Sequence, residues 1–198
     1  MGISKQQAIE NKQAIVAAAG KLFRERGVAA VGLTELTKAA GFTQGGFYNH
    51  FKSKDALVAA VMDEAMEGAA AQLAAAIEAS KAKEADPLRR QINWYLSSSH
   101  RADIDAGCPL TGFAGDVRRL SKEARQSYAH GLASNFDQLA SLISGDNPQE
   151  KRQKAIALFS QMVGSLLLSR AVVEADPTLA DEILEDGRQQ LLRDVSPE

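Results

Sequence analysis

Polar side chains that could contact a nucleic acid lie close together between residues 43 and 54. Thr43 and Gln44 stand where a helix could begin, Tyr48 and His50 follow within two turns, and Lys54 opens the next helical stretch. Hydroxyl, imidazole and ammonium groups bind phosphate oxygens. A glutamine side chain can pair with both hydrogen-bonding atoms of an adenine edge in the major groove. The group therefore predicts backbone and base contacts to double-stranded DNA.

Two short helices joined by a tight turn would position these side chains. The apolar spacing predicts one helix over residues 33–40, a stop at Gly41 and a second helix capped by Thr43. Phe47 and Phe51 share one face of the second helix, so they form its core side and leave the polar tyrosine and histidine off that face. This arrangement is a helix-turn-helix. The same form also occurs as a plain scaffold, and in that alternative the polar tip only packs on the next helix.

The two glycines after Gln44 have no side chain to read bases, so their predicted role is to let the backbone approach the DNA closely. Hydroxyl and ammonium groups of the preceding helix are plausible contacts to phosphates. The complete predicted DNA-binding set is Thr34, Thr37, Lys38, Thr43, Gln44, Gly45, Gly46, Tyr48, Asn49, His50 and Lys54.

The stretch GLTELTKAAGFTQGGFYNHFKSKDALVAAV, residues 32–61, resembles the tetracycline-repressor-like (TetR) family of transcriptional regulators. The family's pattern is A-G-x-[ST], then x-[LFI]-Y-x-H-F, then x-[SN]-K-[DE]-x-L. This chain carries its three parts at residues 40–43, 47–51 and 53–57. The resemblance covers about residues 10–62. One departure is Gly32, where the family usually has a serine or threonine, so a hydroxyl contact to phosphate is lost there.

The resemblance implies an all-α protein whose residues 1–53 form the DNA-binding domain and whose residues 54–198 form a ligand-binding and dimerisation domain. In the family, the residues that match Tyr48, His50 and Lys54 contact the DNA backbone. The implied function is a cytoplasmic, homodimeric repressor that a small-molecule inducer releases from a palindromic DNA operator. No enzyme activity and no cofactor are implied.

Composition and charge agree with that hypothesis and exclude other classes. Residues 1–54 hold eight Lys/Arg and three acidic residues, a net charge of +5, whereas the whole chain has a net charge of −2. A basic segment on an acidic remainder suits a polyanion-binding head. The single cysteine and three scattered histidines give no metal-ligand spacing, so no metal site and no catalytic set are expected. No apolar run of about 18 residues occurs, so neither export nor a membrane partner is expected.

Helical periodicity with capping residues predicts about nine helices and no strand. The expected helices are residues 5 or 8 to 26, 33–40, a third begun by Thr43, a fourth capped by Ser53 and ending near 80, 87–100, a short one through 117–119, one capped by Ser121 and ending near 143, 148–172, and a last one from 177 to at least 191. The last two carry broad apolar faces, and two copies of each would make a four-helix dimer interface. Burial of these faces within one subunit is the alternative.

The ligand-binding residues are predicted from aromatic and polar side chains of the C-terminal two thirds. They are Trp94, Ser98, His100, Cys108, Phe113, Tyr128, Phe136 and Met162. For Trp94, Phe113 and Phe136 a place in the core is the competing interpretation. Because aromatic residues are scarce in this part of the chain, any pocket there is expected to be modest in size or aliphatic.

Cys108 supports further hypotheses. A neighbouring cation such as Arg101 could activate its thiol, which would make the chain a regulator that senses oxidants or electrophiles. A buried, inert cysteine is the competing interpretation. An enzyme using Cys108 with His100 would need the base within hydrogen-bond reach of the thiol. A helical adaptor without a DNA role is the last alternative.

Overall fold

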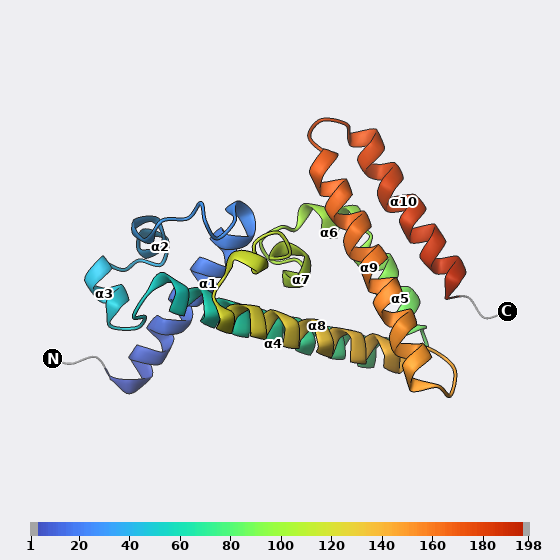
Figure 1. The fold of residues 1–198 in the computed structure, drawn as a ribbon, viewed down its shortest axis with the longest axis horizontal. Coiled ribbons are helices and arrows are strands. Elements are labelled where there is room, and N and C mark those ends of the chain that lie inside the picture. The colour runs from blue at the N-terminus through green and yellow to red at the C-terminus, as the bar shows by residue number, and fades with distance from the viewer. Residues whose placement is uncertain (1–3, 196–198) are drawn as a thin grey trace. The chain divides into compact units, whose positions relative to one another are not determined.

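The computed structural model describes residues 4–195, and within this range it contains α-helices, one short 3-10 helix and no strands. The predicted all-α class is confirmed. The elements, coloured from blue to red along the chain in Figure 1, are α1 (Lys5–Arg26), α2 (Leu33–Ala39), α3 (Gln44–Tyr48), α4 (Lys54–Lys81), α5 (Pro87–Tyr95), α6 (Ser98–Ala102), α7 (Pro109–Gly112), η1 (Val117–Arg119), α8 (Lys122–Leu142), α9 (Pro148–Val172) and α10 (Pro177–Asp194).

Side-chain caps explain why most of these helices begin where they do. Thr43, Asp86, Asn147 and Asp176 each accept a hydrogen bond from a backbone N–H of the first turn of the following helix. A proline follows directly after the last three of them, at the first helical position, where its missing N–H costs nothing. These helix starts agree with the sequence-based prediction.

One helix predicted as continuous is broken in two. The expected helix over residues 87–100 ends at Tyr95, and α6 begins at Ser98. Ser97 causes the break, since its hydroxyl donates to the Trp94 carbonyl (2.7 Å) and accepts from the His100 N–H (3.1 Å). Serine competes in this way with the backbone bonds of a helix interior.

The helices pack into two compact units that are discontinuous in sequence. Unit 1 comprises the residues up to 68 together with 108–130, and unit 2 comprises residues 69–107 and 131 onward. In unit 1 the helix-turn-helix packs on α1 through Phe23, Leu36 and Phe47, of which none exposes more than 1% of its surface. The resemblance implies a division at residue 53, whereas unit 1 also contains residues 54–68 and 108–130.

In unit 2, α9 and α10 form the most extensive helix pair, joined by a short turn at one end (Figure 1). Helix α5 packs against both of them, and Tyr95 meets Phe159 edge to face with ring centroids 5.7 Å apart. By length and composition α9 is apolar enough to cross a membrane. The same composition is found in core helices of globular proteins, and Met162 and Leu166 of α9 are fully buried.

Candidate nucleic-acid interface

Helix α3, the second helix of the helix-turn-helix, is short and is held in place by local contacts. Thr43 caps α3 by accepting the Gly46 N–H at 3.1 Å. The turn before it needs Gly41, whose φ of +75° lies in the left-handed region that favours glycine. Phe47 and Phe51 are buried with ring centroids 5.7 Å apart, which confirms the predicted core side, but α3 ends at Tyr48, so Phe51 lies just beyond the helix to which it was assigned. This five-residue helix, with glycine at two positions, therefore depends on its cap and its aromatic anchor.

The side chains predicted to meet DNA lie mostly on the surface. Tyr48 exposes 57% of its surface, and its ring meets the Phe47 ring in a T-shaped arrangement with centroids 5.4 Å apart. Gln44 is exposed, and its amide donates to the Thr34 hydroxyl at 2.9 Å. His50 is half-buried against Phe42, with ring centroids 6.0 Å apart. Lys38, Thr43, Gly45 and Asn49 are exposed, and Gly46 is half-buried.

Thr37 differs from the rest of the predicted set. Its side chain is 5% exposed, and its hydroxyl donates to the Thr34 carbonyl one turn earlier at 3.0 Å. A threonine whose hydroxyl closes its own helical turn and whose methyl group is buried does not present a donor at the surface. We therefore leave Thr37 out of the surface that could contact DNA.

Lys54 opens α4 as expected, but its ammonium group has a partner inside the domain. Nζ donates to the carbonyl of Val28 at 2.6 Å and lies 5.8 Å from the centre of the Phe23 ring. An ammonium group has three hydrogens, so two further donors remain for phosphate oxygens near the α4 N-terminus.

The start of α2 lacks a side-chain cap, because Gly32 stands at the cap position. An ion pair between Arg26 and Glu35 links the end of α1 to the first turn of α2.

A contact from a distant part of the sequence completes unit 1. The backbone N–H of Val28 donates to Oδ2 of Asp116 at 2.9 Å, across 88 residues of sequence. The sequence analysis missed Asp116 because no local pattern marks it. A loop carboxylate in a segment between two predicted helices has many possible partners.

The predicted ligand-binding residues are divided between the two units. Unit 1 holds Cys108, Phe113 and Tyr128, and unit 2 holds Trp94, Ser98, His100, Phe136 and Met162. In unit 2, Trp94 and His100 stack on each other. Met162 is fully buried, and the rings of Phe136 and Phe159 meet edge to face with centroids 6.1 Å apart. In unit 1, Phe113 is 1% exposed. Phe113 and Met162 thus occupy core positions. For Phe113 this agrees with the alternative interpretation that it is a core residue and not a ligand contact.

Cys108 lies just before α7 and is half-buried. The Tyr128 hydroxyl donates to the Leu110 carbonyl at 2.6 Å. Burial, with a smaller contribution from Cys108, raises the pKa of Tyr128 to about 12. Tyr128 is thus an uncharged donor beside the cysteine segment. His100, the base of the alternative enzyme hypothesis, lies in the other unit.

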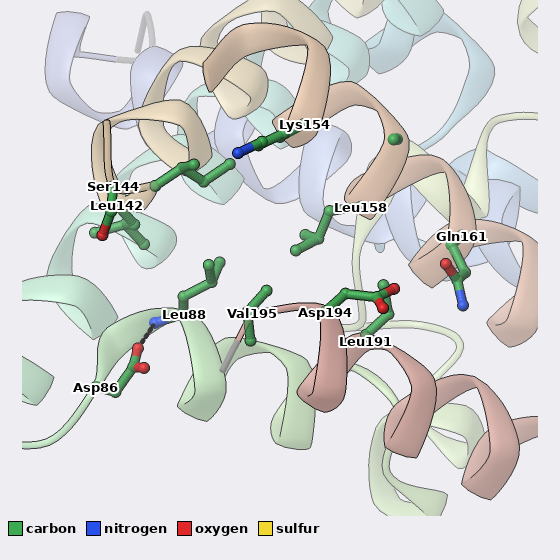
Figure 2. A pocket seen from close by; sticks show the side chains of 12 residues that line it. Asp86, Leu88, Leu142, Ser144, Lys154, Leu158, Gln161, Leu191, Asp194 and Val195 are labelled. Carbon is green, nitrogen blue, oxygen red and sulfur yellow. Dashed lines mark hydrogen bonds between the residues drawn. The ribbon is translucent and has the colours of Figure 1, made fainter. Parts of the chain in front are cut away.

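Unit 2 contains a cavity of about 590 Å³ that the sequence analysis did not identify. Figure 2 shows the side chains of Leu88, Leu158 and Leu191 facing it from α5, α9 and α10, with Lys154 and Gln161 of α9 at its edge. The full lining is Asp86, Leu88, Leu142, Ile143, Ser144, Lys154, Ala157, Leu158, Gln161, Leu191, Asp194 and Val195. It contains no aromatic residue and none of the eight predicted ligand-binding residues.

The sequence of this chain is similar to those of known regulatory proteins. Residues 15–61 match the family model described as bacterial regulatory proteins, tetR family. The transcriptional regulator TtgR of Pseudomonas putida is 39% identical over 103 residues, 52% of this chain and 48% of that protein. The chain spans between 28% and 56% of the length of the first four curated relatives that it matches.

Solved structures share the fold over nearly the whole chain. The crystal structure of Escherichia coli NemR in its reduced form has a TM-score of 0.75 at 20% identity, covering 94% of this chain and 97% of that one. A TetR transcriptional regulator from Legionella pneumophila has a TM-score of 0.76 at 21% identity, covering 99% and 100%. Residues 15–61 thus match the tetR family of bacterial regulatory proteins, with the pattern of residues 40–57 folded as a helix-turn-helix, and the chain shares its fold with the two solved structures.

Proposed function

We propose that this chain is a DNA-binding transcriptional repressor that a small molecule releases from its operator. The observation that carries the proposal is the surface of α3, where Gln44 and Tyr48 are exposed while Phe47 anchors the helix from below. A short helix whose aromatic side chains are buried and whose polar side chains are exposed can enter a major groove while its packing against the rest of the domain stays intact. Several relatives carry the name of transcriptional repressor or regulator.

Selection of bound sequences from a random pool of duplexes, using the purified full chain, tests the proposal. We expect a near-palindromic site and an affinity that falls steeply with salt, by about 0.9 log unit per neutralised phosphate per log unit of salt. Tyr48→Phe should weaken binding to all duplexes alike, whereas Gln44→Ala should change the base preference. Lys83→Ala, an exposed lysine of unit 2, is the matched control. Recovery of unenriched DNA, or binding that salt does not weaken, would contradict the proposal.

The repressor acts as a homodimer in this proposal. Apolar side chains of α9 and α10 remain exposed in the single chain, among them Leu168 at 60% and Ile156, Leu167 and Leu179 at about 40%. Such a face is covered in a soluble protein by a partner, and two-fold pairing would also supply two recognition helices for a palindrome. Sedimentation of the wild type should give a dimer, and Leu168→Glu should shift it to the monomer and weaken operator binding. A monomeric wild type that still binds a full palindrome would contradict the pairing.

We place the effector in the aliphatic cavity of unit 2. Its leucine walls fit a molecule with an alkyl body, and the ammonium of Lys154 and amide of Gln161 supply the few polar contacts that fix orientation. Ala157→Phe would fill the cavity from α9, so this variant should keep operator binding and lose release by effectors. The assay is release of labelled operator by a panel of alkyl carboxylates, alcohols and amines. Release from Ala157→Phe equal to that from the wild type would place the effector elsewhere.

Thiol sensing through Cys108 is a second candidate, favoured by the partial exposure of this cysteine in the unit that holds the helix-turn-helix. One structural relative is described as a reduced form, a name that concerns that protein alone. Treatment with N-ethylmaleimide, which adds to a thiolate, should release the operator from the wild type and not from Cys108→Ser. Modification of Cys108 without any loss of operator affinity would eliminate this candidate. In both proposed functions the protein acts in the cytoplasm, where it would bind its DNA operator.

A further inference from the structure

We propose that Asp116 is a positioning residue for DNA binding, which fixes the Val28 loop and, through that loop, the ammonium group of Lys54. The inference rests on the proposed function, because it concerns how the DNA-contacting surface is held in place. Asp116 lies between α7 and η1, far outside the residues 40–57 that carry the family pattern.

Two hydrogen bonds hold Val28 from opposite directions. Its N–H donates to Asp116 Oδ2 at 2.9 Å, and its carbonyl accepts from Lys54 Nζ at 2.6 Å. Val28 is only 6% exposed, so water has little access to either backbone group. Removal of the carboxylate would leave a buried N–H without a partner, and an unsatisfied donor of this kind drives the loop to rearrange.

The residue before Val28 fits the carboxylate closely. Gly27 has a φ of +80°, and a Cβ added there would come within 3.2 Å of Asp116 Oδ2. Both the backbone conformation and the close approach thus favour glycine at this point. The Asp116 side chain is 18% exposed, and Oδ1 lies 3.4 Å from the Arg119 guanidinium. The carboxylate is therefore committed to the loop on one oxygen and to its own segment on the other.

The position of Lys54 depends on that loop. Its ammonium group uses one hydrogen on the Val28 carbonyl and keeps two for phosphate oxygens at the start of α4. If the loop moves, the carbonyl no longer holds the ammonium, and a flexible four-carbon side chain loses its fixed direction. The same loop joins α1 to α2, so the contact also fixes the entry to the helix-turn-helix.

A double-mutant cycle separates this role from plain stabilisation. Operator affinity of the full chain is measured from low to moderate salt for the wild type, Asp116→Ala, Lys54→Ala and the double variant, at a temperature where unfolding curves show all four folded. Asp63→Ala is the matched control. Asp63 is also a carboxylate of unit 1, and it accepts a hydrogen bond from Ser127, which like Asp116 belongs to residues 108–130, instead of from Val28. Asp116→Asn keeps an oxygen acceptor for the Val28 N–H and serves as the rescue variant.

If Asp116 acts through Lys54, Asp116→Ala and Lys54→Ala each reduce the salt slope by about 0.9 per subunit contact, and the double variant loses no more than Lys54→Ala alone. Asp116→Asn should recover most of the affinity, and Asp63→Ala should keep the wild-type slope. A lower melting temperature of Asp116→Ala with an unchanged slope, or fully additive losses of affinity, overturns the inference. If the wild type itself binds no DNA, the proposed function fails first; if only the cycle fails, the proposed function stands.

Discussion

Trp94 and His100 stack face to face in unit 2, with ring centroids 4.3 Å apart and ring planes 24° from parallel. His100 is 2% exposed, its Nδ1 lies 2.8 Å from the Tyr95 carbonyl, and Trp94 is half-exposed. Because Trp94 is the sole tryptophan of the chain, its fluorescence reports on one histidine.

This pair predicts a fluorescence titration below neutrality. Burial is the main cause that lowers the pKa of His100 from 6.5; the Arg170 charge adds to it, while the bond to the Tyr95 carbonyl and the Asp103 charge oppose it. Protonation would place a cation against the indole face and change its emission. We expect an emission change with a midpoint below pH 6.5, absent in His100→Gln. A midpoint above pH 6.5 would contradict the pKa direction.

The same histidine makes stability depend on pH. In the unfolded chain His100 takes up a proton near pH 6.5, whereas in the folded protein it does so only at lower pH. The unfolded state therefore binds more protons between these values, and the stability contributed by neutral His100 is present above pH 6.5 and lost as the pH falls through this window. Urea unfolding at pH 7.5 and pH 5.5 should show a smaller loss for His100→Gln than for the wild type. Equal losses would mean that other groups carry the effect.

Gly45→Ala should raise the stability of α3 and lower the affinity for DNA. A Cβ at this position would meet only the Thr43 hydroxyl, at 4.0 Å, so Gly45→Ala introduces no clash within the protein. Alanine should stabilise an exposed helical position by up to about 1 kcal/mol, measured by urea unfolding. If the glycine serves close approach to DNA, operator affinity should fall in the same variant. A gain in stability without loss of affinity would assign the glycine no role at the interface.

Thr34 should influence base preference without touching bases. Its hydroxyl accepts the Gln44 amide at 2.9 Å and so directs that side chain. Thr34→Val removes the acceptor with little change of volume, and duplex selection with this variant should give a relaxed preference at the position that Gln44→Ala also affects. Thr34→Ser retains the hydroxyl and should keep the wild-type preference.

Gly187 of α10 lies close to Ser165 of α9. A Cβ there would lie 2.5 Å from the Ser165 Oγ and 3.1 Å from its Cβ, so Gly187→Ala forces the helices apart. Overpacking of this kind costs typically about 1–3 kcal/mol, which thermal unfolding can measure. Gly68→Ala, in α4 with open space around the added methyl group, is the control and should not destabilise the protein.

Local signals explain which parts of this molecule could be predicted from sequence. Asp86, Asn147 and Asp176 mark helix starts because a cap and its N–H partners lie within three residues. The Phe47 and Phe51 anchor follows from helical spacing, and the exposure of Tyr48 follows from its place off that face. These features depend on neighbours in the chain, so sequence patterns contain them.

The break at Ser97 escaped prediction although its partners are local, because sequence alone leaves open whether the hydroxyl competes with the backbone bonds of the helix. Features that depend on distant partners escaped prediction as well. The burial of Thr37 depends on how α2 packs on α1. The Asp116 contact spans 88 residues, and the cavity is lined by residues of four helices, α5, α8, α9 and α10. Each requires the tertiary arrangement before it can be recognised.

The discontinuous make-up of unit 1 limits how the helix-turn-helix of this chain can be transplanted into another protein. A chimera that grafts residues 1–53 onto the body of another protein would leave behind residues 108–130, and with them the carboxylate that anchors the Val28 loop. A transfer of the helix-turn-helix should therefore move both stretches together, because the unit that can be exchanged is defined by packing and not by a single boundary in the sequence.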